Sequence, residues 1–365
     1  MLKSWNFQLI AITLLTSSVL IGRVVLIPVT LQIFLSTVLI VFLGSIYSVK
    51  VYDTKKEREV EIMQQKDAWM FPVFGSGVLF GLFLVFKYFD KDMVNILFHI
   101  YFSVLGGYSV GCLIYERIHT LPFFEGLAAK KLFTIPPIKF ITEKETKIDI
   151  LDIFSLALGG VVGVYYYIYK TWTLNNLLGI AFSIFGIENI MLGQFKVGFI
   201  LLGLLFFYDI FWVFGTPVMV TVAKNLDGPI KLMFPKEIKE SYDTLKDFNM
   251  IGLGDIVIPG IYVALMLRYD IIKYIRENPN RRDITLGLCQ CKYFIFTLFG
   301  YALGIVATLA IMNIFRAAQP ALLYLVPGCL LTSLLTSVVR GDFNQLWNFN
   351  EELALGELKE KNKAN

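Results

Sequence analysis

The sequence predicts an all-α protein that crosses a membrane as a bundle of nine helices. Of its 365 residues, 56% are hydrophobic and only 17% are charged, whereas a soluble domain carries about a quarter charged residues. The apolar residues form near-continuous runs of about 20, the length that a helix needs to cross the hydrocarbon core. The lipid bilayer is therefore an expected partner. Nucleic acid is not, because no Lys/Arg run is interleaved with aromatic residues in a polar segment.

Nine main apolar segments are expected to form the membrane-spanning helices. An additional apolar stretch, Phe7–Gly22, follows Lys3 and ends at Arg23, so residues 1–28 could be a signal-like segment or an extra span. Helices 1–5 then occupy 29–193, the catalytic helices 6–9 occupy 194–338, and 339–365 form a cytosolic tail that is expected to be flexible. The nine segments lie near 29–49, 70–87, 94–115, 150–169, 174–191, 197–223, 250–268, 293–315 and 319–338.

The distribution of basic residues predicts the orientation of these spans. One alternate set of connecting segments holds more than twice as many Lys and Arg residues as the opposite set. The positive-inside rule places the richer set in the cytosol. The segment 197–223 is then expected to run outward from the cytosol, and 250–268 to run back. The richer set comprises 50–68, 116–149, 192–196, 269–292 and the tail.

Three acidic residues lie well inside apolar runs: Glu188, Asp209 and Asp255. A charge at the middle of the membrane costs a few kcal/mol, about 3 on insertion scales, so such residues face the bundle interior and are functional candidates. Glu188 lies near the end of its segment, where an interfacial or structural role is expected. Asp209 and Asp255 lie on consecutive helices, which can bring their side chains together.

Two neighbouring carboxyl groups cannot both ionise, so they share a proton. That is the state in which an aspartic protease can activate water with one carboxylate and polarise the scissile carbonyl with the other. A transporter that couples flux to protons or cations through the same carboxylates fits the residues equally well. No metal or cofactor is expected, because His99 and His119 lack a ligand cluster and the motif H-E-x-x-H is absent.

The residues around the two aspartates suggest how a peptide could reach them. Gly252 and Gly254 remove side-chain bulk next to Asp255, so another backbone can approach. Pro259 frees a backbone carbonyl one turn earlier in the helix. The run Gln319–Leu322 opens the last segment; it could be a plain helix start or an extended stretch that presents backbone groups to a peptide strand.

Three short motifs carry a resemblance to a known family. Tyr208-Asp209, Gly252-Leu253-Gly254-Asp255 and Pro320-Ala321-Leu322 occur on successive late segments. In that order they resemble the Y-D, G-x-G-D and P-A-L motifs of the signal peptide peptidase and presenilin family of intramembrane aspartyl proteases. The longer runs 208–224, 252–260 and 319–327 are similar to the signal peptide peptidase branch, and the resemblance covers about 29–345.

The resemblance implies a presenilin-like arrangement of nine helices and a role for each motif residue. Asp209 and Asp255 would be catalytic. Active-site support would come from Tyr208, Gly252, Leu253 and Gly254, and substrate binding from Gln319, Pro320, Ala321 and Leu322.

The resemblance also implies substrates and a location. Signal peptides left in the endoplasmic reticulum membrane would be the main substrates, with tail-anchored proteins as further ones. The end of the chain, Lys361-Asn362-Lys363-Ala364-Asn365, is similar to a dilysine retrieval signal and agrees with a multi-pass protein of the endoplasmic reticulum. A second copy of the chain and quality-control proteins are further candidate partners. A non-catalytic scaffold in membrane quality control remains a second alternative to the protease.

Overall fold

The computed structural model describes residues 11–16, 28–49, 61–118, 131–135, 146–237, 248–278, 290–315 and 319–363. This part of the chain is mainly helical, and seven of its helices are long and apolar enough to cross a membrane. The prediction of a helical multi-pass membrane protein is therefore confirmed. The seven helices are α2 (Val29–Ser48), α3 (Gln65–Tyr88), α4 (Lys91–Ile118), α6 (Ile150–Tyr169), α8 (Phe195–Phe214), α11 (Lys292–Phe315) and α12 (Leu322–Arg340).

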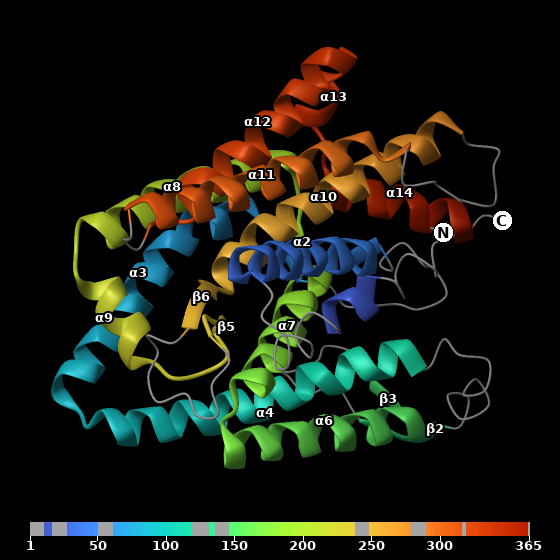
Figure 1. Ribbon diagram of the computed structural model, residues 1–365. Helices are drawn as coiled ribbons and strands as arrows, with labels where there is room; N and C mark the ends of the chain where they lie inside the picture. Colours follow the sequence, from blue (N-terminus) through green and yellow to red (C-terminus); the bar gives the residue numbers. More distant parts are fainter. Residues whose placement is uncertain are drawn as a thin grey trace.

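Two further helices fill the remaining predicted segments but fall outside this set of seven. They are α7 (Trp172–Asn189) and α10 (Gly254–Glu277). Arg268 and Asp270 lie within α10 and are buried. Figure 1 shows α10 running through the middle of the bundle, where it contacts α2, α7, α8, α11 and α12. A helix that is surrounded by protein can carry polar side chains that lipid would not tolerate.

Short strands connect the helices in three two-stranded pairings. β1 (Glu61–Met63) pairs in parallel with β4 (Ile190–Leu192). β2 (Lys131–Ile135) and β3 (Thr146–Asp149) are antiparallel and lead into α6. β5 (Lys231–Pro235) and β6 (Phe248–Gly252) form an antiparallel ribbon directly before α10.

Small residues bring α4 and α6 unusually close together (Figure 1). A Cβ atom added at Gly159 would lie 2.1 Å from the carbonyl oxygen of Gly107, and one at Gly163 would lie 2.4 Å from that of Ser103. A Cβ atom added at Gly106 would instead lie 3.0 Å from the side chain of Leu178 in α7. Glycines of α4 and α6 thus serve helix contacts within one chain, as small residues commonly do in membranes.

We expect Gly159→Ala to lower the free energy of unfolding of the detergent-solubilised protein by about 1–3 kcal/mol, because the new methyl group must push the two backbones apart. The melting temperature measures this loss. Gly160→Ala is the matched control, since no atom lies within 4 Å of a Cβ there. Its effect should stay within about 0.5 kcal/mol. Equal melting temperatures for the two variants would show that the α4–α6 contact is not tight.

The predicted segment 197–223 is two helices rather than one. α8 ends at Phe214, and α9 (Val218–Asn225) starts after Pro217. Gly215 and Pro217 explain the break, because proline cannot continue the hydrogen-bond ladder of a preceding helix. The segment expected from residue 250 also begins differently, since β6 extends to Gly252 and α10 starts at Gly254.

Polar residues of α7 and α4 hold the β5–β6 ribbon in place. Asn176 both donates to the carbonyl of Met233 and accepts from its N–H, each at 2.7 Å, and Asn175 donates to the carbonyl of Lys231 at 2.8 Å. His99 of α4 lies 3.2 Å from Asp227 in the loop before β5. This hydrogen bond holds the pKa of Asp227 below its usual range. The ribbon thus has a fixed position relative to the start of α10.

The tail that was predicted to be flexible is ordered over its described length, so that prediction was wrong. It forms α13 (Phe343–Trp347) and α14 (Glu351–Lys363). Glu351 forms a buried ion pair with Arg268 of α10, with Nε and Oε1 2.5 Å apart. The N–H of Phe195 donates to the carbonyl of Phe349 at 3.2 Å. These long-range contacts order a segment whose own composition is polar.

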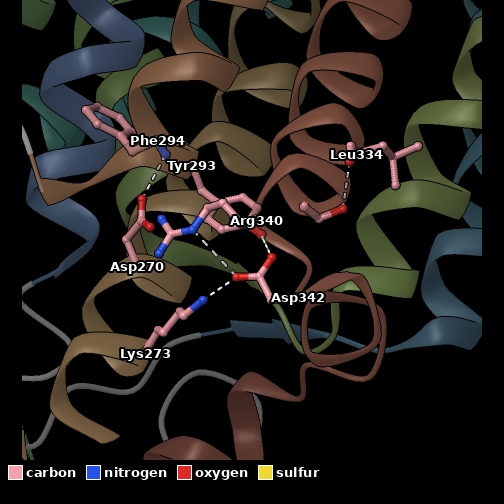
Figure 2. A network of polar contacts seen from close by, with 8 residues as sticks. Asp270, Lys273, Tyr293, Phe294, Leu334, Arg340 and Asp342 are labelled. Carbon is pink, nitrogen blue, oxygen red and sulfur yellow. Dashed lines mark hydrogen bonds and ion pairs between the residues drawn. The ribbon is translucent and has the colours of Figure 1, made fainter. Parts of the chain in front are cut away.

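A second polar cluster fastens the tail to the same end of the bundle (Figure 2). Asp342 follows α12 and accepts from Lys273 of α10 and from the hydroxyl of Tyr293 of α11. Burial opposes the ionised form of Asp342, but these partners outweigh it and lower the pKa of the carboxyl below its ordinary value. Asp270 accepts the N–H of Phe294 at 2.9 Å. The ends of α10, α11 and α12 are thereby joined.

The N-terminal apolar stretch lies mostly outside the described residues. Residues 11–16 of it are helical, and Ala11 and Leu15 are buried in the main hydrophobic core. The rest of Phe7–Gly22 is not described, and neither are Ala364 and Asn365 of the dilysine-like tail. The signal-or-span alternative therefore stays a prediction.

Candidate active site

Asp209 lies in the second half of α8, with only 3% of its surface exposed. Its Oδ2 accepts a hydrogen bond from the backbone N–H of Leu322, at 3.1 Å. Leu322 is the first residue of α12, where the N–H groups have no partner inside the helix. The carboxyl of Asp209 therefore caps α12, and this contact joins the first and third motifs of the sequence.

Asp255 lies in the first turn of α10 and is partly exposed. A Cβ atom added at Gly252 would lie 3.4 Å from its Oδ2, and the only atom within 4 Å of one at Gly254 belongs to Ile258 of the same helix. No other backbone fills this space in the described part of the chain. The room that the two glycines leave beside Asp255 is therefore open to a ligand.

The packing of α8 on α10 brings the two carboxyl groups into one site. A Cβ at Gly198, near the start of α8, would lie 2.8 Å from the ring of Tyr262. α12 contacts Asp209 through Leu322, α11 contacts the backbone of Asp255 through Tyr301, and α11 packs on α12 beside these residues, so both aspartates lie at the same end of the bundle. Asp209 lies near enough to Asp255 for the two carboxyl groups to interact electrostatically. Among the described residues, no Lys, Arg or His forms an ion pair with either carboxyl.

The neighbouring tyrosine of the first motif contacts α3. The hydroxyl of Tyr208 would lie 3.5 Å from a Cβ at Gly75 of α3, and its ring lies 6.3 Å from that of Trp212. Trp212 in turn donates to the hydroxyl of Ser76 at 3.1 Å. Tyr208 thus packs α8 against α3.

The stretch Gln319–Ala321 precedes α12, which begins at Leu322 rather than at 319. Pro320, Ala321 and Leu322 are buried, whereas Gln319 is partly exposed. The side chain of Gln319 accepts from the hydroxyl of Tyr324 at 3.5 Å. Within the second motif, the N–H of Leu253 donates to the carbonyl of Ile230 at 2.9 Å, which ties it to the loop before β5.

One buried acidic residue is not part of the pair, and one residue that the sequence did not predict contacts it. Glu188, the third acidic residue of the apolar runs, is buried at the end of α7 near Tyr47 and Arg117. Sequence reasoning missed Tyr301 of α11, whose hydroxyl lies 3.5 Å from the backbone oxygen of Asp255. The sequence signal for this contact was Pro259. It predicted that a backbone carbonyl one turn earlier is free, but it did not predict which residue would bind that carbonyl.

A helical multi-pass protein that brings two carboxyl groups together from adjacent helices, with no ion-pair partner for either among the described residues, has the arrangement of the class that hydrolyses peptide bonds inside membranes. A sequence model of the family described as "Signal peptide peptidase" matches residues 55–353. The chain is 37% identical to the signal peptide peptidase of Homo sapiens and 38% identical to that of Mus musculus, over 88% of this chain and 82% of each relative. It is 30% identical to a probable intramembrane protease of Schizosaccharomyces pombe, over 87% of this chain and 92% of that protein.

The chain therefore belongs to the signal peptide peptidase family and is an intramembrane aspartyl protease. The predicted family resemblance is confirmed. Family membership favours the protease over the transporter and the non-catalytic scaffold that the two aspartates alone left open. It also implies that its substrates are peptides that span the lipid bilayer.

Proposed function

We propose that Asp209 and Asp255 are the catalytic pair. Between them they hold one proton, because two adjacent carboxyls in a site of low polarity cannot both ionise. The ionised carboxylate takes a proton from water, whose oxygen attacks the scissile carbonyl carbon. The protonated carboxyl donates to the carbonyl oxygen. Proton transfer to the amide nitrogen then breaks the C–N bond and releases the two peptide ends.

The hydrogen bond from Leu322 to Asp209 is the observation that carries this proposal, because it places the third motif at the first aspartate. A substrate strand would pass between the start of α12 and the open space at Gly252 and Gly254. Gln319, Pro320, Ala321 and Leu322 would line one side of that path. Leu253 would support this path by fixing the β5–β6 ribbon, and Tyr208 would support it by packing α8 against α3.

We further propose nine membrane spans, with α7 and α10 as the two that are more polar. The charge distribution then places the β5–β6 ribbon on the lumenal side and α13 and α14 in the cytosol. The relatives named signal peptide peptidase support remnant signal peptides of the endoplasmic reticulum membrane as substrates, with the chain itself resident there. Tail-anchored proteins and other short single-span helices are further candidates.

A substrate helix must unwind before it can be cut, because its carbonyl groups are hydrogen-bonded within the helix and lipid offers no other partner. We therefore expect model signal peptides with Gly, Ser or Pro near the cleavage site to be cut faster than an all-leucine core. The expected difference is on the order of tenfold, since glycine and proline weaken a helix by roughly 1–3 kcal/mol.

The measurement is initial cleavage rate in detergent for a pair of peptides of equal length and flanking sequence. Asp255→Asn protein provides the background rate. Equal rates for the two peptides would contradict the unwinding step. Flux of ions on adding substrate, with no peptide products, would contradict the protease itself.

A further inference from the structure

The helix that carries Asp255 has a gap in its hydrogen-bond ladder at that residue. In an α-helix the carbonyl of residue 255 accepts from the N–H of residue 259. Residue 259 is proline, which has no N–H. The backbone carbonyl of Asp255 therefore lacks its ordinary partner within α10, and a carbonyl left without a partner inside the protein destabilises the fold.

A tyrosine of the neighbouring helix lies where that partner is missing. The hydroxyl of Tyr301 donates to the carbonyl oxygen of Asp255 at 3.5 Å, the long end of the range for a hydrogen bond. The side chain of Tyr301 is fully buried. Because α10 and α11 pack against each other in the helix bundle, the hydroxyl has a defined position.

Close packing of α11 against α12 fixes the position of Tyr301 along the bundle. The adjacent Gly300 faces Gly328 of α12, and a Cβ on Gly300 would lie 2.2 Å from the carbonyl oxygen of Gly328. A Cβ atom added at Gly304, one turn later, would lie 2.9 Å from the Cα atom of Leu325. α11 and α12 therefore form one closely packed pair. A shift of either helix along the other would bring backbone atoms into collision.

This helix pair contacts both aspartates. α12 donates the N–H of Leu322 to the carboxyl of Asp209, and α11 donates the hydroxyl of Tyr301 to the backbone of Asp255. The two donors come from one rigid unit, so they fix the two halves of the site relative to each other. A carboxylate pair needs such fixed geometry, because small displacements of reacting groups cost large factors in rate.

We propose that Tyr301 is a positioning residue for Asp255: its hydroxyl replaces the N–H that Pro259 lacks and holds the first turn of α10 in register with Asp209. This inference rests on the proposed catalytic role of Asp255. Tyr301 itself does not touch the reacting atoms. The proline provides a turn whose carbonyl is free, and the tyrosine provides the partner that prevents this turn from moving.

Tyr301→Phe is expected to lower kcat about tenfold with little change in KM, because substrate contacts are unaltered while the carboxyl pair is less well aligned. Tyr262→Phe is the matched control. Tyr262 is equally buried and its hydroxyl lies 2.7 Å from that of Ser333, but it does not contact Asp255. An equal loss of kcat in both variants would overturn the proposal.

A double-mutant cycle with Pro259→Ala tests the hydrogen bond itself. Alanine restores the N–H of residue 259, so the carbonyl of Asp255 regains a partner inside α10. In that background Tyr301→Phe should change kcat less than twofold, and the same coupling should appear in melting temperature. Undiminished effects of Tyr301→Phe on both readouts would overturn the proposal. The melting cycle does not depend on catalysis, so its outcome stays separate from a failure of the proposed function.

Discussion

Asp209→Asn and Asp255→Asn are each expected to lower cleavage of a model signal peptide by about 10²–10⁴-fold, the range of acid–base catalysis by one side chain. Asparagine matches aspartate in size and can still accept the N–H of Leu322, so the Asp209 variant keeps the cap on α12. What it loses is the ability to take or give a proton. The measurement is initial rate in detergent at saturating peptide.

Glu188→Gln is the control for the loss of a buried acid as such. Glu188 is the remaining acidic residue that the sequence places within an apolar run, and it is buried at the end of α7 near Tyr47 and Arg117. We expect this variant to cleave at a rate close to that of the unmodified protein. Substantial activity in either aspartate variant, with the melting temperature unchanged, would reject the catalytic pair.

Glu351→Ala is expected to destabilise the protein by about 3–5 kcal/mol, because it leaves the charge of Arg268 buried without its partner. Arg268 is 0% exposed and Glu351 is 1% exposed, and a second contact joins Nη2 and Oε2 at 3.4 Å. The pair links α10 to α14. Thermal unfolding in detergent, followed by tryptophan fluorescence, measures the effect.

A neighbouring pair on the same two helices provides the control. Arg276 and Glu357 are also joined, at 3.1 Å, but their side chains are 52% and 61% exposed. Glu357→Ala should cost less than about 1 kcal/mol, because solvent screens an exposed pair. The double variant Arg268→Met/Glu351→Leu should recover most of the loss. Equal destabilisation by Glu351→Ala and Glu357→Ala would show that burial of the first pair is not what matters.

The features that the sequence predicted are those with a local chemical signal. Uncharged runs of about 20 residues located the helices, because the hydrocarbon core fixes their length. The carboxyls of Asp209 and Asp255 stood out because an acid at that depth is costly unless it has a function. The space beside Asp255 followed from Gly252 and Gly254, since a missing side chain can be read directly from the sequence.

The features that the sequence did not predict depend on partners distant along the chain. The polar composition of 341–363 indicated a flexible tail, but α14 is ordered by Arg268, which lies 83 positions before Glu351. The apolar composition of 197–223 predicted one helix, but α8 ends at Phe214 and α9 starts after Pro217. The partner of the Asp255 carbonyl lies 46 positions away, on a helix whose register depends on packing.

Binding of a peptide isostere whose hydroxyl stands in for the attacking water tests the shared role of the two carboxyls most directly. We predict that the unmodified protein and Glu188→Gln bind a fluorescent form of it equally well in detergent. Asp209→Asn and Asp255→Asn should each bind it at least about 10²-fold more weakly, because a transition-state mimic depends on contacts made only during the reaction. If either aspartate variant bound as tightly as the unmodified protein, the two carboxyls would not act together on one water molecule.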